Sequence, residues 1–140
     1  MPAIRQKLHL SPCADFRDRL FGPEVLARCM GVNAIFLRSP NIADYNRNVD
    51  RQTRAQVTYF CKTHVLQIID VVDPDKIVVI EFSTLKLFGP TEPDLINAKG
   101  RILTRTGKIG NRKAVAMLHL SGAYISNADR DFIRDRILAN

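Results

Sequence analysis

The sequence predicts an α/β protein: a three-layer α/β/α arrangement around a short, mainly parallel central sheet. Two apolar runs, Val32–Leu37 and Lys76–Phe82, have the composition of buried strands. The segment between them, Arg51–Val72, carries apolar residues at steps of three and four, which is the period of an amphipathic helix. A long helix between two buried strands is typical of a βαβ unit, so we expect these two strands to run parallel.

The first 30 residues are predicted to be a divergent helical segment or arm of one domain that spans residues 1–140. Ile4–Leu10 alternates apolar and polar residues, as an edge strand or an ordered arm does. A short helix is expected over Ala14–Leu20, where Gly22 and Pro23 end it. Pro23 also suits the first turn of a second helix, which would continue to Met30.

Asn33 is the single polar residue of the first apolar run, and a buried amide needs partners for both its donor and its acceptor. It bonds either to neighbouring backbone or to the amide of a ligand. Arg38–Arg51 follows as a predicted polar loop. Its arginines Arg38, Arg47 and Arg51 either follow a phosphate backbone or lie in solvent, and the sequence favours neither.

The helix over Arg51–Val72 is the clearest element of the sequence. Its apolar stripe comprises Val57, Phe60, Cys61, Val65, Ile68, Ile69 and Val72. His64 falls on the same stripe, where a histidine is more often a core residue than a ligand. Cys61 and His64 have no further Cys or His at a matching spacing, so no metal site is expected.

The second half of the chain is predicted to contain a short helix, two strands and a final helix. The short helix covers Ser83–Phe88, and a turn-rich loop covers Gly89–Pro93. Arg101–Thr106 alternates as a strand and turns through Gly107–Gly110 into the apolar run Ala114–Leu118. Ser126 and Asp129 form a capping box for the last helix, which runs to Leu138 with an apolar stripe of Phe132, Ile133 and Ile137.

His119 is predicted to stand at the carboxyl end of a buried strand, on a loop that leads to a helix. Ligands of open α/β sheets bind at this edge, which makes His119 a candidate site residue. The alternative is a histidine at the edge of the core whose ring bonds to backbone. Ser121 has no G-x-S-x-G elbow around it, so we do not expect it to be a nucleophile.

The composition favours a polyanionic partner and gives no sign of membrane insertion. The chain has 21 Lys and Arg against 14 Asp and Glu, a net charge of +7, and arginine suits phosphate oxygens. No apolar run reaches the roughly 18 residues of a membrane span, and the N-terminus lacks the apolar core of a secretory signal. Cys13, Cys29 and Cys61 are widely spaced, which predicts reduced thiols in a cytoplasmic protein.

Three segments resemble, in order, the uracil-DNA glycosylase superfamily, and its iron–sulfur branch in particular. Asn33-Ala-Ile-Phe-Leu-Arg-Ser-Pro-Asn41 is similar to the asparagine-bearing strand and polar loop of that branch, tN-v-v-k-c-r-P-P-x-N. Cys61 with the later run Asp73-Pro74-Asp75-Lys76-Ile77-Val78-Val79 is similar to C-x-x-x-L … i-x-P-k-v-i-v. His119-Leu-Ser-Gly122 resembles the H-P-S loop of the superfamily, so the resemblance covers residues 31–137.

The resemblance implies a role for several of these residues. Asn33 would hydrogen-bond the uracil edge, and His119 would donate to the base oxygen that gains charge as the glycosidic bond breaks. Leu120, Ser121 and Gly122 would form the loop that presses into DNA around a flipped base. The expected partner is DNA, bound in addition by Arg38, Arg47 and Arg51.

The chain also departs from this family pattern. The water-activating loop of the G-x-x-P-G kind has no match between Met1 and Met30, where Gly22-Pro23-Glu24 is nearest, and the strand before that loop is missing as well. The chain is thus a truncated member, or its N-terminal segment fills the gap, or a partner chain or homo-oligomer completes the sheet. Leu120 replaces the usual proline, and Glu81 stands where the family tends to have glycine.

No cofactor is expected either. An iron–sulfur cluster needs four cysteines, but Leu37 occupies one ligand position and only Cys61 matches another.

Two function classes follow from the sequence. The first is a uracil-DNA glycosylase-like protein of base-excision repair, with reduced or absent hydrolysis. The second is a non-catalytic basic α/β module that binds nucleic acid or a protein partner through its arginine loops. A hydrolase of free nucleosides is a weaker third possibility, which would show activity on small substrates and no footprint on DNA.

Overall fold

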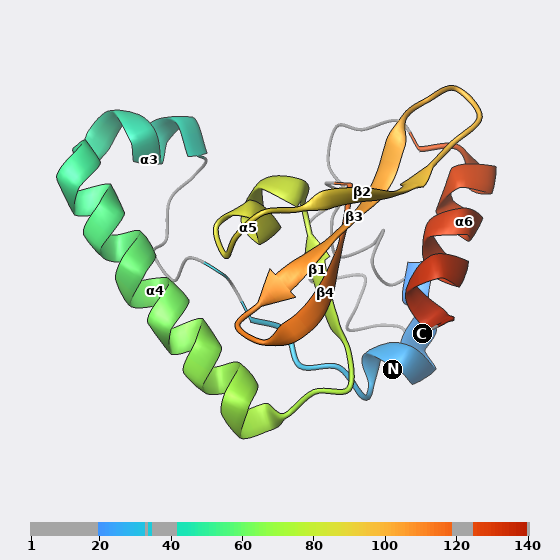
Figure 1. Cartoon of the computed structure of the whole chain (residues 1–140), viewed down its shortest axis with the longest axis horizontal. Helices are drawn as coiled ribbons and strands as arrows, with labels where there is room; N and C mark the ends of the chain where they lie inside the picture. Colours follow the sequence, from blue (N-terminus) through green and yellow to red (C-terminus); the bar gives the residue numbers. More distant parts are fainter. Residues whose placement is uncertain (1–19, 33, 35–41, 119–124, 140) are drawn as a thin grey trace, which may run out of the picture. The chain divides into compact units, whose positions relative to one another are not determined.

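The computed structural model describes residues 20–32, 34, 42–118 and 125–139 (Figure 1). The chain divides into two compact units, one of residues 1–30 and 76–140 and one of residues 31–75. Each unit is described by itself below. The single domain expected over residues 1–140 stays a prediction.

The first unit is built on a four-stranded sheet with the order β1-β4-β3-β2. Its strands are β1 (Ile77–Ile80), β2 (Glu92–Ile96), β3 (Ile102–Ile109) and β4 (Arg112–Met117). The α/β class is therefore confirmed. The prediction of a mainly parallel sheet is wrong, because β1 pairs with β4 in parallel whereas β3 pairs antiparallel with both β2 and β4.

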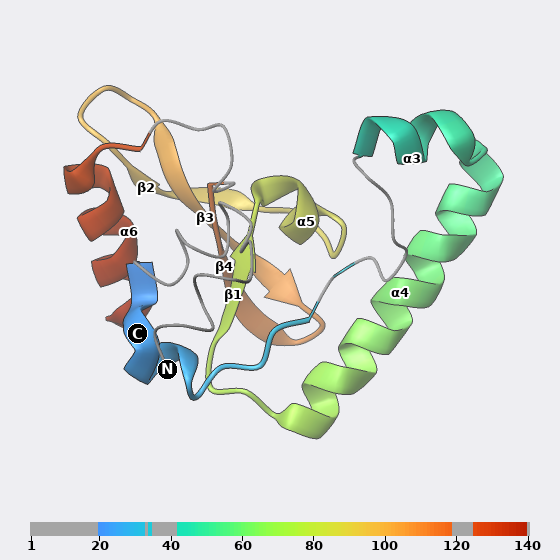
Figure 2. The ribbon, with the colours of Figure 1, turned by 180° about the vertical axis from the view of Figure 1, so that it is seen from behind.

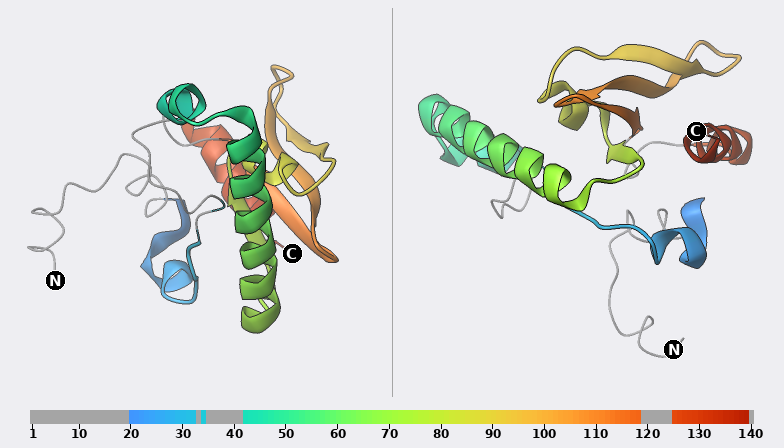
Figure 3. Two further views of the ribbon diagram at one scale, coloured as in Figure 1. Left: turned by 90° about the vertical axis from the view of Figure 1, so that its left-hand side faces the viewer. Right: turned by 60° about the horizontal axis from the view of Figure 1, so that its bottom comes forward.

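The antiparallel share of the sheet has a local cause. Only Gly110 and Asn111 separate β3 from β4, and so short a connection joins only antiparallel neighbours. Gly110 has φ 60°, a conformation that glycine adopts without a steric cost. Figure 3 shows the two strands side by side as a hairpin.

β2 begins inside the loop predicted over Gly89–Pro93 and continues through residues 94–96, for which no element was predicted. Pro93 and two acidic residues give Glu92–Ile96 little strand propensity. The strand forms at the edge of the sheet, which is where a proline that cannot donate a ladder hydrogen bond is tolerated. Its register against β3 shifts on both sides of Leu95.

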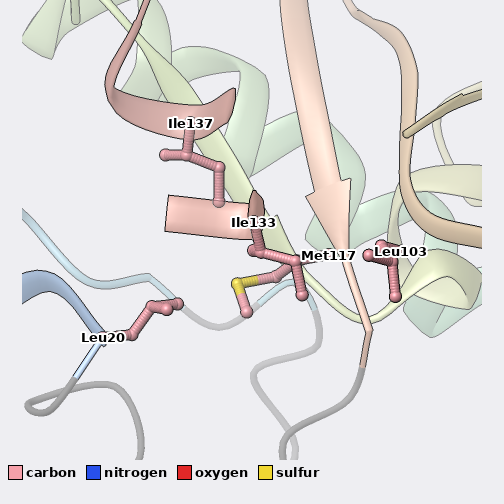
Figure 4. Close-up of a cluster of buried hydrophobic side chains, with 5 residues drawn as sticks. All are labelled: Leu20, Leu103, Met117, Ile133 and Ile137. Atoms are coloured by element: carbon pink, nitrogen blue, oxygen red, sulfur yellow. The ribbon is translucent and has the colours of Figure 1, made fainter. Parts of the chain in front are cut away.

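One face of the sheet packs on the last helix, α6 (Asn127–Leu138). In the parallel register of β1 and β4, Ile80 stands opposite Met117, and Met117 is fully buried. Met117 contacts a cluster to which α6 contributes Ile133 and Ile137, as Figure 4 shows. Leu20, from a helical stretch over residues 20–26, completes this cluster beside the C-terminal half of α6 (Figure 2).

That helical stretch corrects the boundaries expected for the N-terminal helices. Residues 20–26 are helical across Gly22 and Pro23, where the sequence analysis placed a break. The helix also stops before Met30. The other predictions for residues 1–19 lie outside the described residues.

A short helix, α5 (Phe82–Lys86), follows β1 directly and packs near Gly107 of β3. Leu85 of α5 is buried at 1% exposure. A Cβ added at Gly107 would lie 3.1 Å from the backbone oxygen of Pro90 and 3.3 Å from Leu85 Cδ2. The absence of a side chain at Gly107 therefore lets α5 and the loop after it approach the sheet closely.

The capping box of α6 is confirmed, but one residue of its predicted apolar stripe is not buried. Ser126 is the N-cap, and its hydroxyl accepts a hydrogen bond from the Asp129 N–H at 3.1 Å. Ile133 and Ile137 are buried, whereas Phe132 is 56% exposed. Phe132 directly precedes Ile133, and a step of one residue turns a helical side chain about 100° away from its neighbour.

The second unit contains α3 (Ile42–Asn48) and α4 (Arg51–Val72). α4 has the bounds predicted from its periodicity, begins at the N-cap Asp50 and ends at Asp73 in a left-handed conformation. Cys61 and Val65 of the predicted stripe are buried, whereas Phe60 is 56% exposed. The loop predicted over Arg38–Arg51 is wrong where α3 forms, because a helix of 7 residues with few apolar side chains is too short to show a helical period.

Candidate functional site

The carboxyl ends of β1 and β4 lie side by side and define one edge of the sheet. The parallel register pairs Ile80 with Met117, the last residues of the two strands. The backbone N–H of Glu81 donates a further hydrogen bond to the Met117 carbonyl at 2.9 Å. The chain therefore leaves both strands at neighbouring points, and we call this edge, with Glu81, Ser83 and Leu118, the strand-end edge.

Glu81 has an unusual backbone conformation at this edge, with φ 87° and ψ 131°. A non-glycine residue at such a φ suffers steric strain between Cβ and the backbone. The carboxylate is held by the hydroxyl of Ser83, which donates to Oε1 at 2.6 Å. Glu81 thus presents an acidic group at the strand-end edge, where the family resemblance implied only a departure from the usual glycine.

Most of the predicted site residues lie outside the described residues. These are the catalytic candidate His119, the substrate-binding candidates Asn33, Ser121 and Gly122, and the DNA-binding candidates Arg38 and Leu120. Their roles stay predictions. Leu118, the residue before His119, is partly buried against the core cluster.

Arg47 and Arg51 are the predicted DNA-binding residues that the structure describes, and both belong to the second unit. Arg47 is in the last turn of α3 with its side chain 74% exposed, and its Nη1 lies 3.6 Å from Asp44 Oδ1. Arg51 is the first residue of α4 and is exposed. An exposed ion pair of this kind contributes little to stability, so Arg47 can exchange Asp44 for a phosphate oxygen at small cost.

Arg54, the next arginine along α4, has a structural task. Its Nη1 donates to the backbone oxygens of Asn46 at 2.5 Å and Val49 at 3.1 Å. These bonds satisfy carbonyls at the end of α3 and tie α3 to α4. Arg54 is therefore not a free DNA contact.

Asp50 carries the clearest electrostatic perturbation in the described residues. The Thr53 hydroxyl donates to Asp50 Oδ2 at 2.6 Å, and the Thr53 N–H donates to Oδ1 at 2.9 Å. Both bonds favour the ionised carboxylate, so they hold the pKa of Asp50 below its ordinary value of 3.8. The shift has a capping cause at the start of α4 and does not identify a catalytic acid.

His64 has a local partner. Its Nδ1 lies 2.8 Å from the Phe60 carbonyl oxygen, and the two rings have centroids 4.1 Å apart. The Nδ1 of the ring thus has its hydrogen-bond partner within α4. Across the described residues, no group of three or more His, Cys, Asp or Glu is arranged to hold a metal ion.

The β3–β4 hairpin is a basic element that the sequence analysis missed. The chain between Asp94 and Asp129 contains no acidic residue. It contains six cationic residues, namely Lys99, Arg101, Arg105, Lys108, Arg112 and Lys113. The sequence shows this feature as a long segment without acidic residues. The cations of β3 and β4 come to lie side by side only because the two strands pair.

Arg105 of that set is held in place by its neighbours. Its Nε donates to Thr91 Oγ1 at 2.9 Å, and its Nη2 donates to the Thr91 carbonyl at 3.2 Å. The guanidinium carbon also lies 5.9 Å from the ring centroid of Phe82. Arg105 therefore connects β3 to α5 and to the loop before β2.

No family model, curated protein or solved structure matches the chain. Among the helices that the structure describes, none has the length and apolar character to cross a membrane. Of the two cysteines that the structure describes, Cys29 is exposed and Cys61 is buried.

Proposed function

We propose that this chain is a uracil-DNA glycosylase-like protein that binds DNA and a base flipped out of it. The observation that carries the proposal is the parallel pair of β1 and β4. Their carboxyl ends meet at one edge, and the segment with His119 begins two residues after the end of β4. Ligands of α/β sheets bind at such edges, because loops from neighbouring strands emerge there together.

The conformation of Glu81 supports the same proposal. The family to which the chain bears a resemblance tends to have glycine at this position, and φ 87° is a backbone conformation that favours glycine. The chain thus has a glycine-type turn directly after β1 even though its residue there is a glutamate. The proposal includes the three-layer α/β/α arrangement of that family as the architecture of this chain.

In the proposed mechanism, Asn33 and His119 provide the chemistry. The Asn33 amide pairs with a donor and an acceptor on the base, and His119 donates a hydrogen bond to the base oxygen that becomes negative. Ser121 and Gly122 allow close approach to the DNA backbone, while Leu120 presses into the duplex. Without a matched water-activating loop, cleavage proceeds slowly by a dissociative route: the glycosidic bond breaks first, the base leaves with the bonding electron pair, and solvent water then adds to the sugar cation and loses a proton to solvent. Stabilisation of the leaving base is the main contribution.

The proposal also includes the surroundings of the site. Arg38, Arg47 and Arg51 contact phosphates, and the protein acts in the cytoplasm. β1 stands at one edge of the four-stranded sheet. A strand supplied by a partner chain or by a second copy would extend the sheet at this edge.

The experiment is an excision assay on single- and double-stranded DNA that contains uracil. We expect cleavage above background that His119→Ala and Asn33→Ala each abolish. The matched controls are His64→Ala and Asn48→Ala, a partly exposed histidine and an exposed asparagine of the second unit, which should retain activity. Absence of cleavage by the wild-type chain on both substrates would contradict the proposal.

A non-catalytic nucleic-acid-binding module is the second candidate. The acid-free segment between Asp94 and Asp129 favours it, because binding to a polyanion needs positive charge and no catalytic group. In this case Asn33→Ala and His119→Ala leave binding intact. Removing Arg38, Arg47 and Arg51 together then flattens the salt dependence of binding.

A further inference from the structure

The positive charge of this protein is concentrated in one part of the first unit. The chain has a net charge of +7, and the segment between Asp94 and Asp129 contributes six Lys or Arg with no acidic residue. The rest of the chain is nearly balanced. The strands β3 and β4 and the turns beside them therefore carry cationic side chains and no acidic residue of their own, and such a run of cations attracts a polyanion.

Two of these cations face each other across the β3–β4 ladder. Lys108 of β3 is the direct register partner of Lys113 of β4, next to the pair of Ile109 and Arg112 that closes the hairpin. Directly opposed residues place their Cβ atoms about 5 Å apart, and like charges at that spacing destabilise a hairpin. Both lysines are exposed, and no ion pair or side-chain hydrogen bond to either is found within the described residues. The fold accepts a repulsion that an anion between the two ammonium groups would remove.

The turn between the lysines is polar. It consists of Gly110 and Asn111, and the nearest large apolar side chain, Ile109, is only 4% exposed. A hairpin that inserts into a lipid surface needs exposed apolar side chains at its tip, which this one lacks. A narrow ribbon with cations and a small polar turn suits contact with phosphates of nucleic acid.

We propose that the tip of the β3–β4 hairpin, defined as Lys108–Lys113, binds the phosphate backbone of nucleic acid through Lys108 and Lys113. The proposal rests on the nucleic-acid binding proposed above but not on base excision. Lys113 precedes Met117 by four residues, which at ~3.3 Å per residue places it about 13 Å along β4 from the strand-end edge. The hairpin tip therefore contacts backbone beyond a base held at that edge, and it adds affinity without reading sequence.

The test compares the affinity of the full chain for a fluorescently labelled DNA duplex without uracil, as a function of salt. The variant is Lys108→Gln with Lys113→Gln. The matched control is Arg130→Gln with Arg134→Gln, which removes the same charge from α6, where Arg134 lies 3.4 Å from Asp131. We expect the hairpin variant to bind roughly tenfold more weakly and its salt slope to fall by about 2, since each phosphate contact contributes about 0.9.

Lys113→Glu separates loss of binding from loss of folding. It turns the opposed pair into one of opposite charge, so its melting temperature should equal or exceed that of the wild-type chain while its affinity for DNA falls. Three results would overturn the proposal: an unchanged salt slope in the hairpin variant, an equal loss in the α6 control, or binding to phosphatidylserine vesicles without binding to duplex. Failure of uracil excision, in contrast, contradicts only the glycosylase proposal.

Discussion

Glu81 is a non-glycine residue in a backbone conformation that favours glycine, and this conformation lowers the stability of the fold. Strain at φ 87° is of the order of 1–3 kcal/mol, whereas glycine at an ordinary position costs about 0.5–1 kcal/mol in chain entropy. We therefore expect Glu81→Gly to raise the free energy of unfolding by about 1 kcal/mol, measured by urea denaturation. Glu81→Ala keeps the Cβ and should bring no such gain; an equal gain from both variants would locate the effect in the lost carboxylate instead.

Asp50 allows a prediction about pH at the same scale. Because the two hydrogen bonds from Thr53 lower its pKa in the folded chain, the ionised carboxylate stabilises α4 above pH 3.8, and this contribution is lost as the pH falls through the lower folded value. Thr53→Val removes the hydroxyl bond, which is the larger cause. We expect the pKa of Asp50, followed by NMR of its carboxyl carbon, to move up toward 3.8. A pKa unchanged by the substitution would show that the hydroxyl bond has no part in the shift.

Polar contacts join β2, β3 and α6 at the scale of the elements. Arg136 of α6 contacts Asp94 of β2 through two guanidinium nitrogens, at 2.7 and 3.0 Å. The hydroxyl of Thr104 donates to the same carboxylate at 2.9 Å and accepts from the Leu95 N–H at 3.1 Å. Thr104 is fully buried, so these bonds satisfy groups that water cannot reach.

Thr104→Val keeps the shape of the side chain but removes both of its hydrogen bonds. The Leu95 N–H then loses its partner, at a cost of about 1–3 kcal/mol. We expect the free energy of unfolding to fall by this amount in a chemical denaturation series. The control is Thr106→Val on the same strand, at a partly exposed threonine, and it should be near neutral. A similar loss in both variants would refute the role given to the hydroxyl.

Local patterns predicted some of these elements well and others not at all. α4 and the cap of α6 follow from periodicity and from Ser126, because both depend on residues close together in the chain. β2 escaped detection because its pairing with β3, and not its own propensity, makes it a strand. The parallel pairing of β1 with β4 joins residues more than thirty positions apart, which no local pattern encodes.

The candidate site residues likewise include some that the sequence identified and others that it did not. Arg47 and Arg51 were identified as cations of a presumed loop, yet they stand on α3 and α4. The opposed lysines of the hairpin were missed, because Lys108 and Lys113 become neighbours only through the register of β3 and β4. The sequence gives the net charge of the whole chain, whereas the pairing of the strands determines which charged side chains lie close together.

At the scale of the whole molecule, the core of the first unit joins distant parts of the chain. Leu20, Leu103, Met117, Ile133 and Ile137 form one cluster (Figure 4), so the N-terminal helical stretch, the sheet and α6 stabilise one another. A cavity at its centre should therefore weaken the whole unit rather than fray one helix.

Ile133→Ala tests this dependence. Ile133 is fully buried, and truncating a buried isoleucine to alanine costs about 2–5 kcal/mol. Its neighbour Phe132 is 56% exposed, so Phe132→Ala should cost far less although it removes a larger side chain. We expect circular dichroism and protection of the β3 and β4 amides from hydrogen exchange to report the same loss for Ile133→Ala. If the helical signal falls while the strand amides keep their protection, α6 and the sheet unfold independently, and the cluster does not unite them.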